Sequence, residues 1–473
     1  MSQIEKTSET VEGNGEVQFR IIVGSYEHSL LCLSLILPND LKNKQPIFQP
    51  IFHFQAHSLS IRCMDIAKRY LVTGSNDEHI KIYDLQKRKE LGTLLQHQGS
   101  ITSLVFSDDK DEEDDEDEAE EDEEKKQKKQ KQIQNQKKSG RSLKKNAVET
   151  NVDGNKILSH KSGKWLLSAS DDGKIVIWRT KDWESYAVLK GHQGRINDLA
   201  IHPSGRIAVS VSEDKTIKLW NLMTAKKAST LKLRGRDTLG QSGQSVRFSK
   251  DGEFFIISFI NKMILFNTRK GTIYKKFKLK NKTIMKLDFI KLNNIEYLII
   301  ALNTGSINFY KFEDILNSTN GNDDDSGNDD DDIIELSDIK TEFELLGHSN
   351  RVKDFSIYQE EHKTGDIKKI LTYLISVSSD GRIVIWDLNL RDQVAVYSTG
   401  ERLNVVTTVS ESIEKASTMK KREDDTENGV SNIDSEYESD GEGLAEIMKG
   451  RKKKLSKKAK RKQKEKLISV ELE

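Results

Sequence analysis

The chain has 473 residues, and its 76 lysines and arginines match 76 aspartates and glutamates, so the formal net charge is zero. Only 35% of the residues are hydrophobic, which is polar for a globular protein but too apolar for a wholly disordered one. The two cysteines, Cys32 and Cys63, exclude a disulfide framework and a cysteine-rich zinc site, and the longest nearly apolar run, Leu30 to Leu37, is too short to span a bilayer.

Charged residues gather in blocks along the chain. The polar residues 1–16 lack the apolar core of a secretory signal, so we expect a soluble intracellular protein with no membrane contact. Acidic residues dominate 108–124, 322–332 and 411–446, and twelve lysines and arginines fall within Lys449 to Lys466. Blocks of like charge repel each other and bury little surface. We therefore predict a disordered N-terminus at 1–15, a folded region at 16–409 with disordered insertions at 108–159 and 314–340, and a disordered acidic, then Lys-rich, tail at 410–473.

A short apolar strand that ends in an aromatic residue recurs six times in the folded region. Where no charged block intervenes, successive aromatic residues are 42, 46 and 44 residues apart. A period in the low forties, built of short alternating strands, is typical of a propeller blade, so we predict an all-β propeller. The six strands are Ile80 to Tyr83, Ile175 to Trp178, Ile217 to Trp220, Met263 to Phe266, Ile307 to Tyr310 and Ile383 to Trp386.

Four of the units carry a second pattern, [S/T]-x-S-x-D, with the aspartate six residues before the aromatic and a histidine upstream. The pattern resembles the WD40 repeat, whose final dipeptide is matched by Trp386-Asp387. The resemblance implies a buried network in which the aromatic group bonds the Ser or Thr, the Ser or Thr bonds the His, and the His bonds the Asp. A buried indole needs an acceptor, and a carboxylate fixes the tautomer of a buried imidazole. The four networks are His57, Thr73, Asp77 and Tyr83; His97, Ser168, Asp172 and Trp178; His192, Ser210, Asp214 and Trp220; and His348, Ser376, Asp380 and Trp386.

The number of blades follows from the two ends of the folded region. Residues 17–37 predict two strands and residues 47–54 a third, while residues 402–410 predict one more. In WD40 propellers a strand from one terminus completes the blade begun by the other, which leaves no unpaired edges. We therefore predict a seven-bladed propeller; a six-bladed ring is the alternative if 16–54 is irregular. The units that end in Phe266 and Tyr310 lack the His and Asp, so we expect them to rely on apolar packing and to be the least regular.

The recurring spacing argues for architecture over catalysis. The histidines and aspartates of the four units are placed identically, and no phosphate-binding loop, HExxH motif or nucleophile elbow is present. We therefore predict a binding platform that is not an enzyme and that uses no cofactor or metal. In WD40 propellers the residues three and five positions after the histidine reach the upper face of the disc, and the resemblance implies the same placement here. The candidate binding residues there are Arg62, Arg195, Asn197, Arg351 and Lys353.

The basic end of the tail predicts nuclear targeting or contact with nucleic acid. A polycation on a flexible tether binds phosphate backbones without reading sequence. The predicted partners of this tail are a nuclear import receptor and ribosomal RNA. The residues that carry the prediction are Arg451, Lys452, Lys453, Lys454, Lys457, Lys458, Lys460, Arg461 and Lys462.

Within the WD40 repeats, several segments resemble the yeast maintenance-of-killer proteins and the animal p21-activated-kinase-interacting proteins. They are the stretches at 19–27, 52–65, 70–85 and 191–205. The resemblance implies a nucleolar scaffold for assembly of the large ribosomal subunit, which binds pre-ribosomal proteins as a monomer within a larger assembly. The alternatives are a signalling adaptor that negatively regulates a p21-activated kinase, and a substrate receptor of a ubiquitin ligase.

Overall fold

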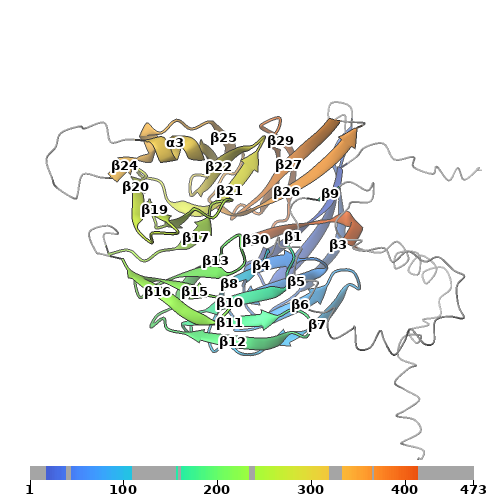
Figure 1. The fold of residues 1–473 in the computed structure, drawn as a ribbon. Coiled ribbons are helices and arrows are strands. Elements are labelled where there is room, and N and C mark those ends of the chain that lie inside the picture. Colours follow the sequence, from blue (N-terminus) through green and yellow to red (C-terminus); the bar gives the residue numbers. More distant parts are fainter. Residues whose placement is uncertain are drawn as a thin grey trace, which may run out of the picture. The chain divides into compact units, whose positions relative to one another are not determined.

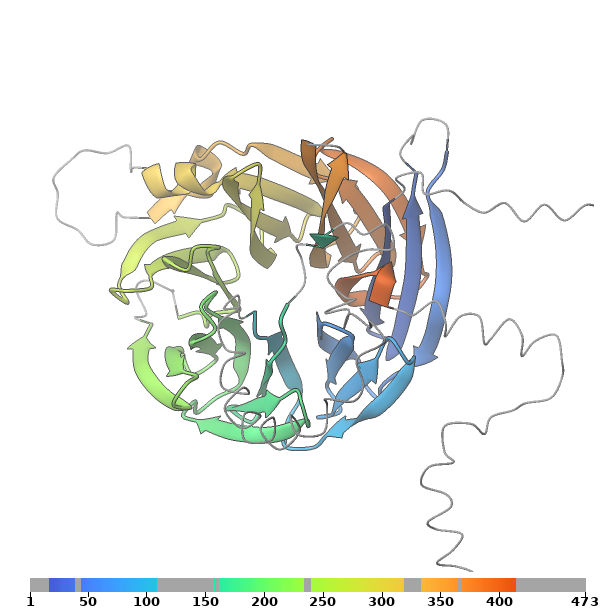
Figure 2. The same cartoon turned by 45° about the vertical axis from the view of Figure 1, so that its right-hand side comes forward.

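Four-stranded antiparallel units make up almost all of the computed structural model. It describes residues 17–38, 44–108, 156–157, 161–233, 240–318, 333–364 and 367–413, which fall within one unit of the chain, Met1–Glu414. Seven sheets are arranged radially around a central axis (Figure 1, Figure 2). The protein is therefore a seven-bladed β-propeller. The predicted fold class is confirmed, and the six-bladed alternative is wrong.

Each blade is named here by its strands from the axis outward. Blade one is β30 (Leu403–Ser410), β1 (Val17–Ser25), β2 (Ser29–Leu37) and β3 (Ile47–Gln55). Blade two is β4 (Ile61–Ala67), β5 (Tyr70–Ser75), β6 (Ile80–Asp84) and β7 (Lys89–Leu94). Blade three is β8 (Ile101–Phe106), β10 (Trp165–Ser170), β11 (Lys174–Arg179) and β12 (Glu184–Lys190). Blade four is β13 (Ile196–Ile201), β14 (Ile207–Ser212), β15 (Thr216–Asn221) and β16 (Lys226–Lys232).

The remaining three blades carry additional elements. Blade five is β17 (Ser245–Phe248), β18 (Phe254–Ser258), β19 (Lys262–Asn267) and β20 (Ile273–Lys278), with β24 (Ile333–Glu335) at its outer edge. Blade six is β21 (Ile284–Leu292), β22 (Ile295–Leu302), β23 (Ser306–Lys311) and β25 (Phe343–Leu346), and the helix α3 (Phe312–Asn317) follows β23. Blade seven is β26 (Val352–Thr364), β27 (Ile367–Ser378), β28 (Arg382–Asp387) and β29 (Asp392–Ser398), with the two-residue β9 (Lys156–Ile157) beside β26.

The hydrophobic core lies between the blades. Seven apolar clusters are present, and each joins the facing sides of two neighbouring sheets. For example, Val72 and Ile82 of blade two pack in one cluster with Leu166 and Trp178 of blade three. The central strands of each blade are therefore buried on both faces, which explains why their sequences are apolar almost throughout.

The ring is closed by pairing between the two ends of the folded region. β30 pairs antiparallel with β1, so the last strand becomes the inner strand of the first blade. The 3-10 helix η3 (Glu411–Ile413) then places Glu411 against Arg20 of β1. The Arg20 side chain is 2% exposed, and its Nε donates to Glu411 Oε2 at 2.9 Å and its Nη2 to Oε1 at 2.5 Å. A buried, two-point ion pair therefore fastens the closing strand.

The predicted disorder at 314–340 is wrong at both ends of that range. Helix α3 buries Phe312 and Ile315, and β24 pairs parallel with β20. After β24 comes a 3-10 helix, η2 (Leu336–Asp338), and the buried Leu336 and Ile339 join the cluster between blades five and six. The charge pattern concealed these apolar side chains, which bury enough surface to order the chain. The insertion predicted at 108–159 is likewise wrong at 156–157, where β9 forms, and the disordered tail predicted from 410 is wrong at 410–413, where β30 ends and η3 forms. The structure does not describe residues 1–16, 109–155, 319–332 or 414–473, so the predictions for them lie outside the described residues.

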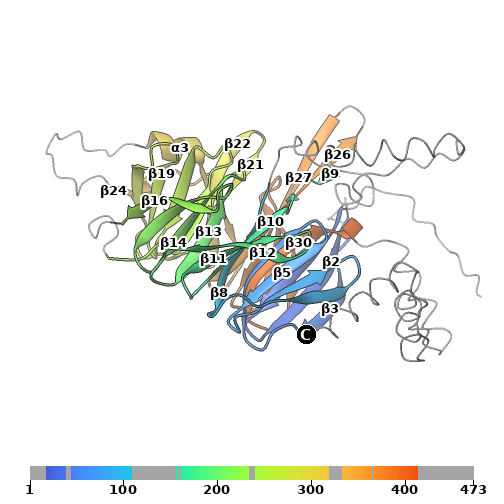
Figure 3. The ribbon, with the colours of Figure 1, turned by 60° about the horizontal axis from the view of Figure 1, so that its bottom comes forward.

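Blade seven departs from the regular pattern by its long hairpin. β26 and β27 are 13 and 12 residues long, and Figure 3 shows them projecting beyond the neighbouring sheets. β9, which precedes β10 of blade three in the chain, pairs with β26 at Glu360 and Glu361. Irregular additions thus occur in blades five and six, which lack the His and Asp, and also in blade seven, which has them.

Candidate functional site

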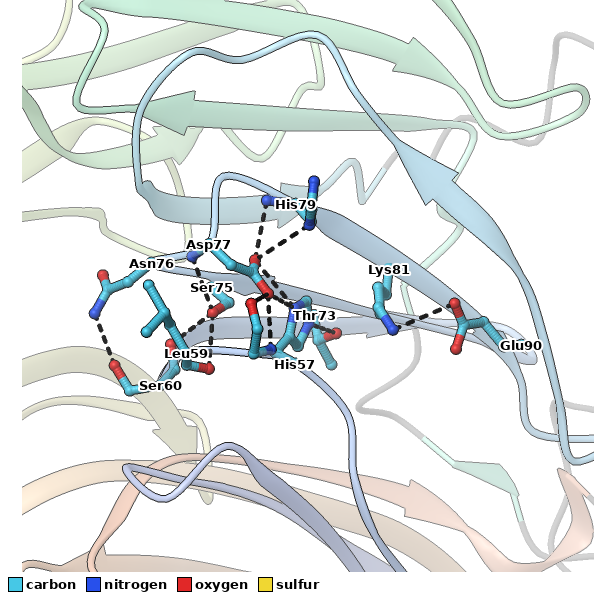
Figure 4. A network of polar contacts seen from close by, with 11 residues as sticks. His57, Leu59, Ser60, Thr73, Ser75, Asn76, Asp77, His79, Lys81 and Glu90 are labelled. Atoms are coloured by element: carbon cyan, nitrogen blue, oxygen red, sulfur yellow. Dashed lines mark hydrogen bonds and ion pairs between the residues drawn. The ribbon is translucent and has the colours of Figure 1, made fainter.

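The His, Ser or Thr, and Asp side chains predicted from the repeat lie in contact at one edge of each of four blades. Figure 4 shows the network of blade two. His57 Nε2 lies 2.8 Å from Thr73 Oγ1, and His57 Nδ1 lies 3.0 Å from Asp77 Oδ2. The same carboxylate accepts the backbone N–H of Ser58 at 3.1 Å. The network ties the loop before the inner strand to the turn after the second strand. We call this edge of the ring the upper face.

The other three networks include the tryptophan. Its indole N–H can only donate, so the serine hydroxyl accepts from it and donates its own proton to His Nε2. The histidine therefore carries its proton on Nδ1 and donates it to the aspartate. In blade three, His97 and Trp178 lie 2.8 Å from Ser168, and His97 lies 3.3 Å from Asp172. In blade four, His192 and Trp220 lie 2.7 and 2.8 Å from Ser210, and His192 lies 2.9 Å from Asp214. In blade seven, His348 and Trp386 lie 2.8 and 2.9 Å from Ser376, and His348 lies 3.4 Å from Asp380.

One substitution of the pattern has a visible consequence. Tyr83 takes the place of tryptophan in blade two, has no indole N–H, and packs edge-on against Phe54 at 5.7 Å between ring centroids.

The glycine of the turn after the second strand contacts the next blade whether or not the Asp is present. Gly173 of blade three, which has the Asp, lies against the loop of His192, and Gly305 of blade six, which lacks it, lies against the loop of His348. Gly305 has φ +89°, and a Cβ atom there would lie 2.4 Å from the carbonyl oxygen of His348. Only glycine fits this contact between blades.

Burial and hydrogen bonding set the ionisation of the networks. Burial lowers the pKa of His57, His192 and His348, although their aspartates act in the opposite direction. Burial acts to raise the pKa of Asp214, but hydrogen bonds from Thr216, the Gln193 N–H and His192 outweigh it and hold that pKa at about 2. The resting network is thus a neutral imidazole beside an ionised carboxylate. That arrangement holds loops together and leaves no proton poised for transfer.

Acidification is expected to loosen the ring through these histidines. Because their pKa is lower in the folded than in the unfolded state, the unfolded chain binds protons first as the pH falls below about 6.5. Stability is therefore full above that pH and is lost as the pH falls toward the folded-state values. The melting temperature of the full chain should decrease between about pH 7 and pH 5. His192→Asn should flatten this slope; equal slopes in the wild type and in this variant would contradict the assignment.

Two of the predicted upper-face residues are engaged within the ring. Arg195 Nε lies 3.0 Å from Asp171 Oδ1 of the neighbouring blade. Asn197 Nδ2 donates to the carbonyl oxygen of Gly243 at 2.7 Å, which joins blade four to blade five. Both side chains therefore have a structural role at this face.

The other three predicted residues have weaker contacts. Arg62 is exposed and reaches Asn76 Oδ1 at 3.5 Å. Arg351 is exposed and donates to Ser379 Oγ at 3.3 Å. Lys353 is half-buried, and its pKa is lowered by burial and by the charges of Arg351 and Arg62. Charge available to a partner is therefore concentrated on these three side chains.

Two buried aspartates of the inner strands escaped the sequence analysis. Asp198 accepts hydrogen bonds from Ser103 of blade three and from Arg247 of blade five, at 2.9 and 2.6 Å. Asp354 accepts from Lys286 of blade six and, at 3.0 Å, from the Val406 N–H of blade one. Each aspartate follows its network histidine by six residues, so the repeat contained the signal. Together they link blades around the axis.

Two kinds of feature are absent from the part of the chain that the structure describes. No three His, Cys, Asp or Glu residues there lie close enough to hold a metal ion, and no helix is long and apolar enough to cross a membrane. A hollow of about 430 Å³ lies between blades six and seven. Its Glu342 contacts Lys311 at 3.1 Å and Arg391 at 3.4 Å, so these charges are committed to ion pairs.

Comparison with known proteins identifies the repeats and the family. The model of the WD domain, G-beta repeat, matches residues 48–84, 146–179 and 183–221. The chain is 45% identical to Protein MAK11 of Saccharomyces cerevisiae over 462 residues, which cover 96% of this chain and 98% of the yeast protein. The protein belongs to the MAK11 family of WD40-repeat proteins. The resemblance found in the sequence is thereby confirmed.

Animal relatives are more distant. The p21-activated protein kinase-interacting protein 1-like protein of Gallus gallus is 26% identical over 341 residues, covering 72% of this chain and 66% of its own length. The corresponding protein of Danio rerio is 25% identical over 370 residues, covering 78% and 73%. A MAK11-family propeller with these relatives is a WD40 scaffold for protein partners.

Proposed function

We propose that the protein is a non-enzymatic scaffold in the assembly of the large ribosomal subunit and acts in the nucleolus. The observation that carries the proposal is the 45% identity to the yeast MAK11 protein over 96% of this chain. The aligned length exceeds that of the ring, so it also takes in charged regions outside the blades. Similarity across ring and appendages supports a shared role better than similarity of the repeats alone would.

The ring supplies the rigid part of such a scaffold. Seven inter-blade cores and four buried networks fix the upper-face loops, and loops on a rigid frame are where binding residues collect. In this role the blades hold pre-ribosomal proteins at fixed positions. The charged regions add contacts that are weak individually and depend on salt.

The basic tail is proposed to deliver the scaffold to its site. Lys449 to Lys466 has the density of positive charge that import receptors and RNA backbones bind. Deleting this run should reduce nuclear and nucleolar accumulation of a fluorescently tagged full chain, while the melting temperature of the ring stays the same. Unchanged localisation of the shortened protein would refute the targeting role.

The function is tested by depletion. Removing the protein from growing cells should lower the precursors of large-subunit ribosomal RNA before small-subunit precursors change, because a missing assembly factor stalls only the particle that needs it. Northern hybridisation of precursor RNA at successive times provides the measurement. Unchanged large-subunit precursors after the protein has disappeared would sink the proposal.

A second candidate function is regulation of a p21-activated kinase. It is favoured by the names of the animal relatives, which describe proteins that interact with such a kinase. In this case depletion should alter kinase activity while leaving ribosomal RNA precursors unchanged. The two candidates therefore give opposite results in the same depleted cells.

A further inference from the structure

Six of the seven inner strands have a β-bulge at their second residue, close to the upper face. In each, the pairing with the next strand skips this residue. A bulged residue has no partner in the ladder, and its side chain is aimed differently from those of its neighbours. Because the bulges recur at one position, six side chains stand at the same level of the ring. They are Arg62, Thr102, Asn197, Met285, Lys353 and Asn404.

Asparagine at this position joins one blade to the next. Asn197 donates to the Gly243 carbonyl at 2.7 Å, and Asn404 donates to the Ile61 carbonyl at 3.0 Å. Arg62 and Lys353 make no such bridge. Arg62 has a long contact with Asn76 and acts electrostatically on Asp171 of blade three, and Lys353 has no hydrogen-bond or ion-pair partner among the residues that the structure describes. The bridging role that explains the asparagines does not explain these two cations.

The cations lie on the two blades that flank blade one. β26, β30 and β4 follow one another around the axis, so Lys353 of blade seven and Arg62 of blade two flank Asn404 of blade one. Arg351 lies two residues before Lys353 and is exposed. The positive charges of Arg351 and Arg62 both act on the half-buried Lys353. Grouping like charges costs free energy in the isolated ring, and a negatively charged partner would recover it.

Exposed apolar side chains border the same sector. Tyr26, in the turn between β1 and β2, is 58% exposed, and Leu59, in the loop before β4, is 47% exposed. The surface therefore offers positive charge at the inner strands and apolar contact beside it. An extended segment with carboxylates and an apolar side chain matches both.

We propose that this cationic sector, formed by Arg62, Arg351 and Lys353 with Tyr26 and Leu59 beside it, binds an acidic segment of another protein. Two exposed acidic residues lie nearby: Glu27 on a turn of blade one and Glu78 on a turn of blade two. They interrupt the broad field of cations that a nucleic acid backbone needs, whereas a short acidic peptide needs only the three cations. The binding does not depend on a role in ribosome assembly.

The described segments that lead into the protein's own acidic runs end at the other edge of the ring. β8, β23 and β30 run away from the upper face, and Asp108 and Ser318 follow the far ends of β8 and α3. The chain beyond Ile413 also continues from that edge. The proposed occupant is accordingly a segment of another protein, supplied in trans.

Asparagine at the equivalent bulges provides the test variant. Arg62→Asn/Lys353→Asn removes both charges and installs the side chain that blades one and four already carry there, so the ring should fold with an unchanged melting temperature. The matched control, Lys227→Asn/Lys232→Asn, removes two exposed cations from the outer strand of blade four. The probe is a fluorescent peptide of alternating glutamate and leucine, and its affinity for each full chain is measured by anisotropy at physiological salt.

The wild type and the control should bind the peptide equally, while Arg62→Asn/Lys353→Asn should bind about tenfold more weakly. A peptide with glutamine in place of glutamate should not distinguish the three proteins. Equal affinity of all three for the acidic peptide would place its binding elsewhere, on the basic tail above all, and would overturn the proposal. The proposal would also be overturned if the affinity for an oligouridylate fell in Arg62→Asn/Lys353→Asn as much as the affinity for the acidic peptide. That result would favour nucleic acid as the occupant.

Discussion

Replacing Glu411 with alanine should lower the free energy of unfolding by about 3–5 kcal/mol, because a buried guanidinium loses the carboxylate that neutralises it. Arg20 is 2% exposed, and Glu411 also accepts a hydrogen bond from Ser34 at 2.9 Å. The pair fastens β30 to β1, so the loss falls on the contact that closes the ring. Urea unfolding of the full chain, followed by tryptophan fluorescence, measures the change.

An exposed ion pair serves as the control for Glu411. Glu90 is 42% exposed and lies 3.5 Å from Lys81, so Glu90→Ala should cost less than about 1 kcal/mol. Replacing both partners, as Arg20→Met/Glu411→Leu, should cost less than Glu411→Ala alone, since no buried charge is then left uncompensated. If Glu411→Ala and Glu90→Ala destabilise the chain equally, the closing role of the buried pair is wrong.

Trp220→Ala should destabilise the ring by about 3–5 kcal/mol, because it leaves a cavity and removes a buried donor. Trp220 is 1% exposed and packs in the cluster between blades three and four, where its indole donates to Ser210. The melting temperature and the urea midpoint of the full chain report the loss.

Trp220→Phe separates packing from hydrogen bonding. Blade five already has phenylalanine at this position, where Phe266 stacks on Phe255 with centroids 5.0 Å apart. Trp220→Phe keeps most of the apolar volume and should cost less than half as much as Trp220→Ala. Equal losses in the two variants would mean that the network, and not the packing, dominates at this site.

The repeating parts of the fold were predictable from the sequence, because each blade solves the same physical problem. The spacing of His192, Ser210, Asp214 and Trp220 is dictated by strand length and turn geometry, so it recurs where the geometry recurs. The closing strand was predictable for a related reason, since an unclosed ring would leave edges unpaired.

Contacts made once in the molecule were not predictable. Arg20 and Glu411 are 391 residues apart, and nothing in the local sequence of either identifies the other. Ile334 and Leu336 adjoin an acidic run whose composition suggests solvation, yet they pack in the core beside blade five. From the sequence, Asn197 and Lys353 were both predicted to be binding residues of the upper face. In the structure the Asn197 amide bridges two blades, whereas no described residue neutralises the charge of Lys353.

The proposed role in large-subunit assembly is tested most directly by purifying the tagged full chain from growing cells and identifying the proteins that accompany it. We predict that large-subunit ribosomal proteins and precursor ribosomal RNA co-purify with it, and that a p21-activated kinase does not. A kinase recovered in stoichiometric amount, with no large-subunit proteins or precursor RNA, would contradict this account.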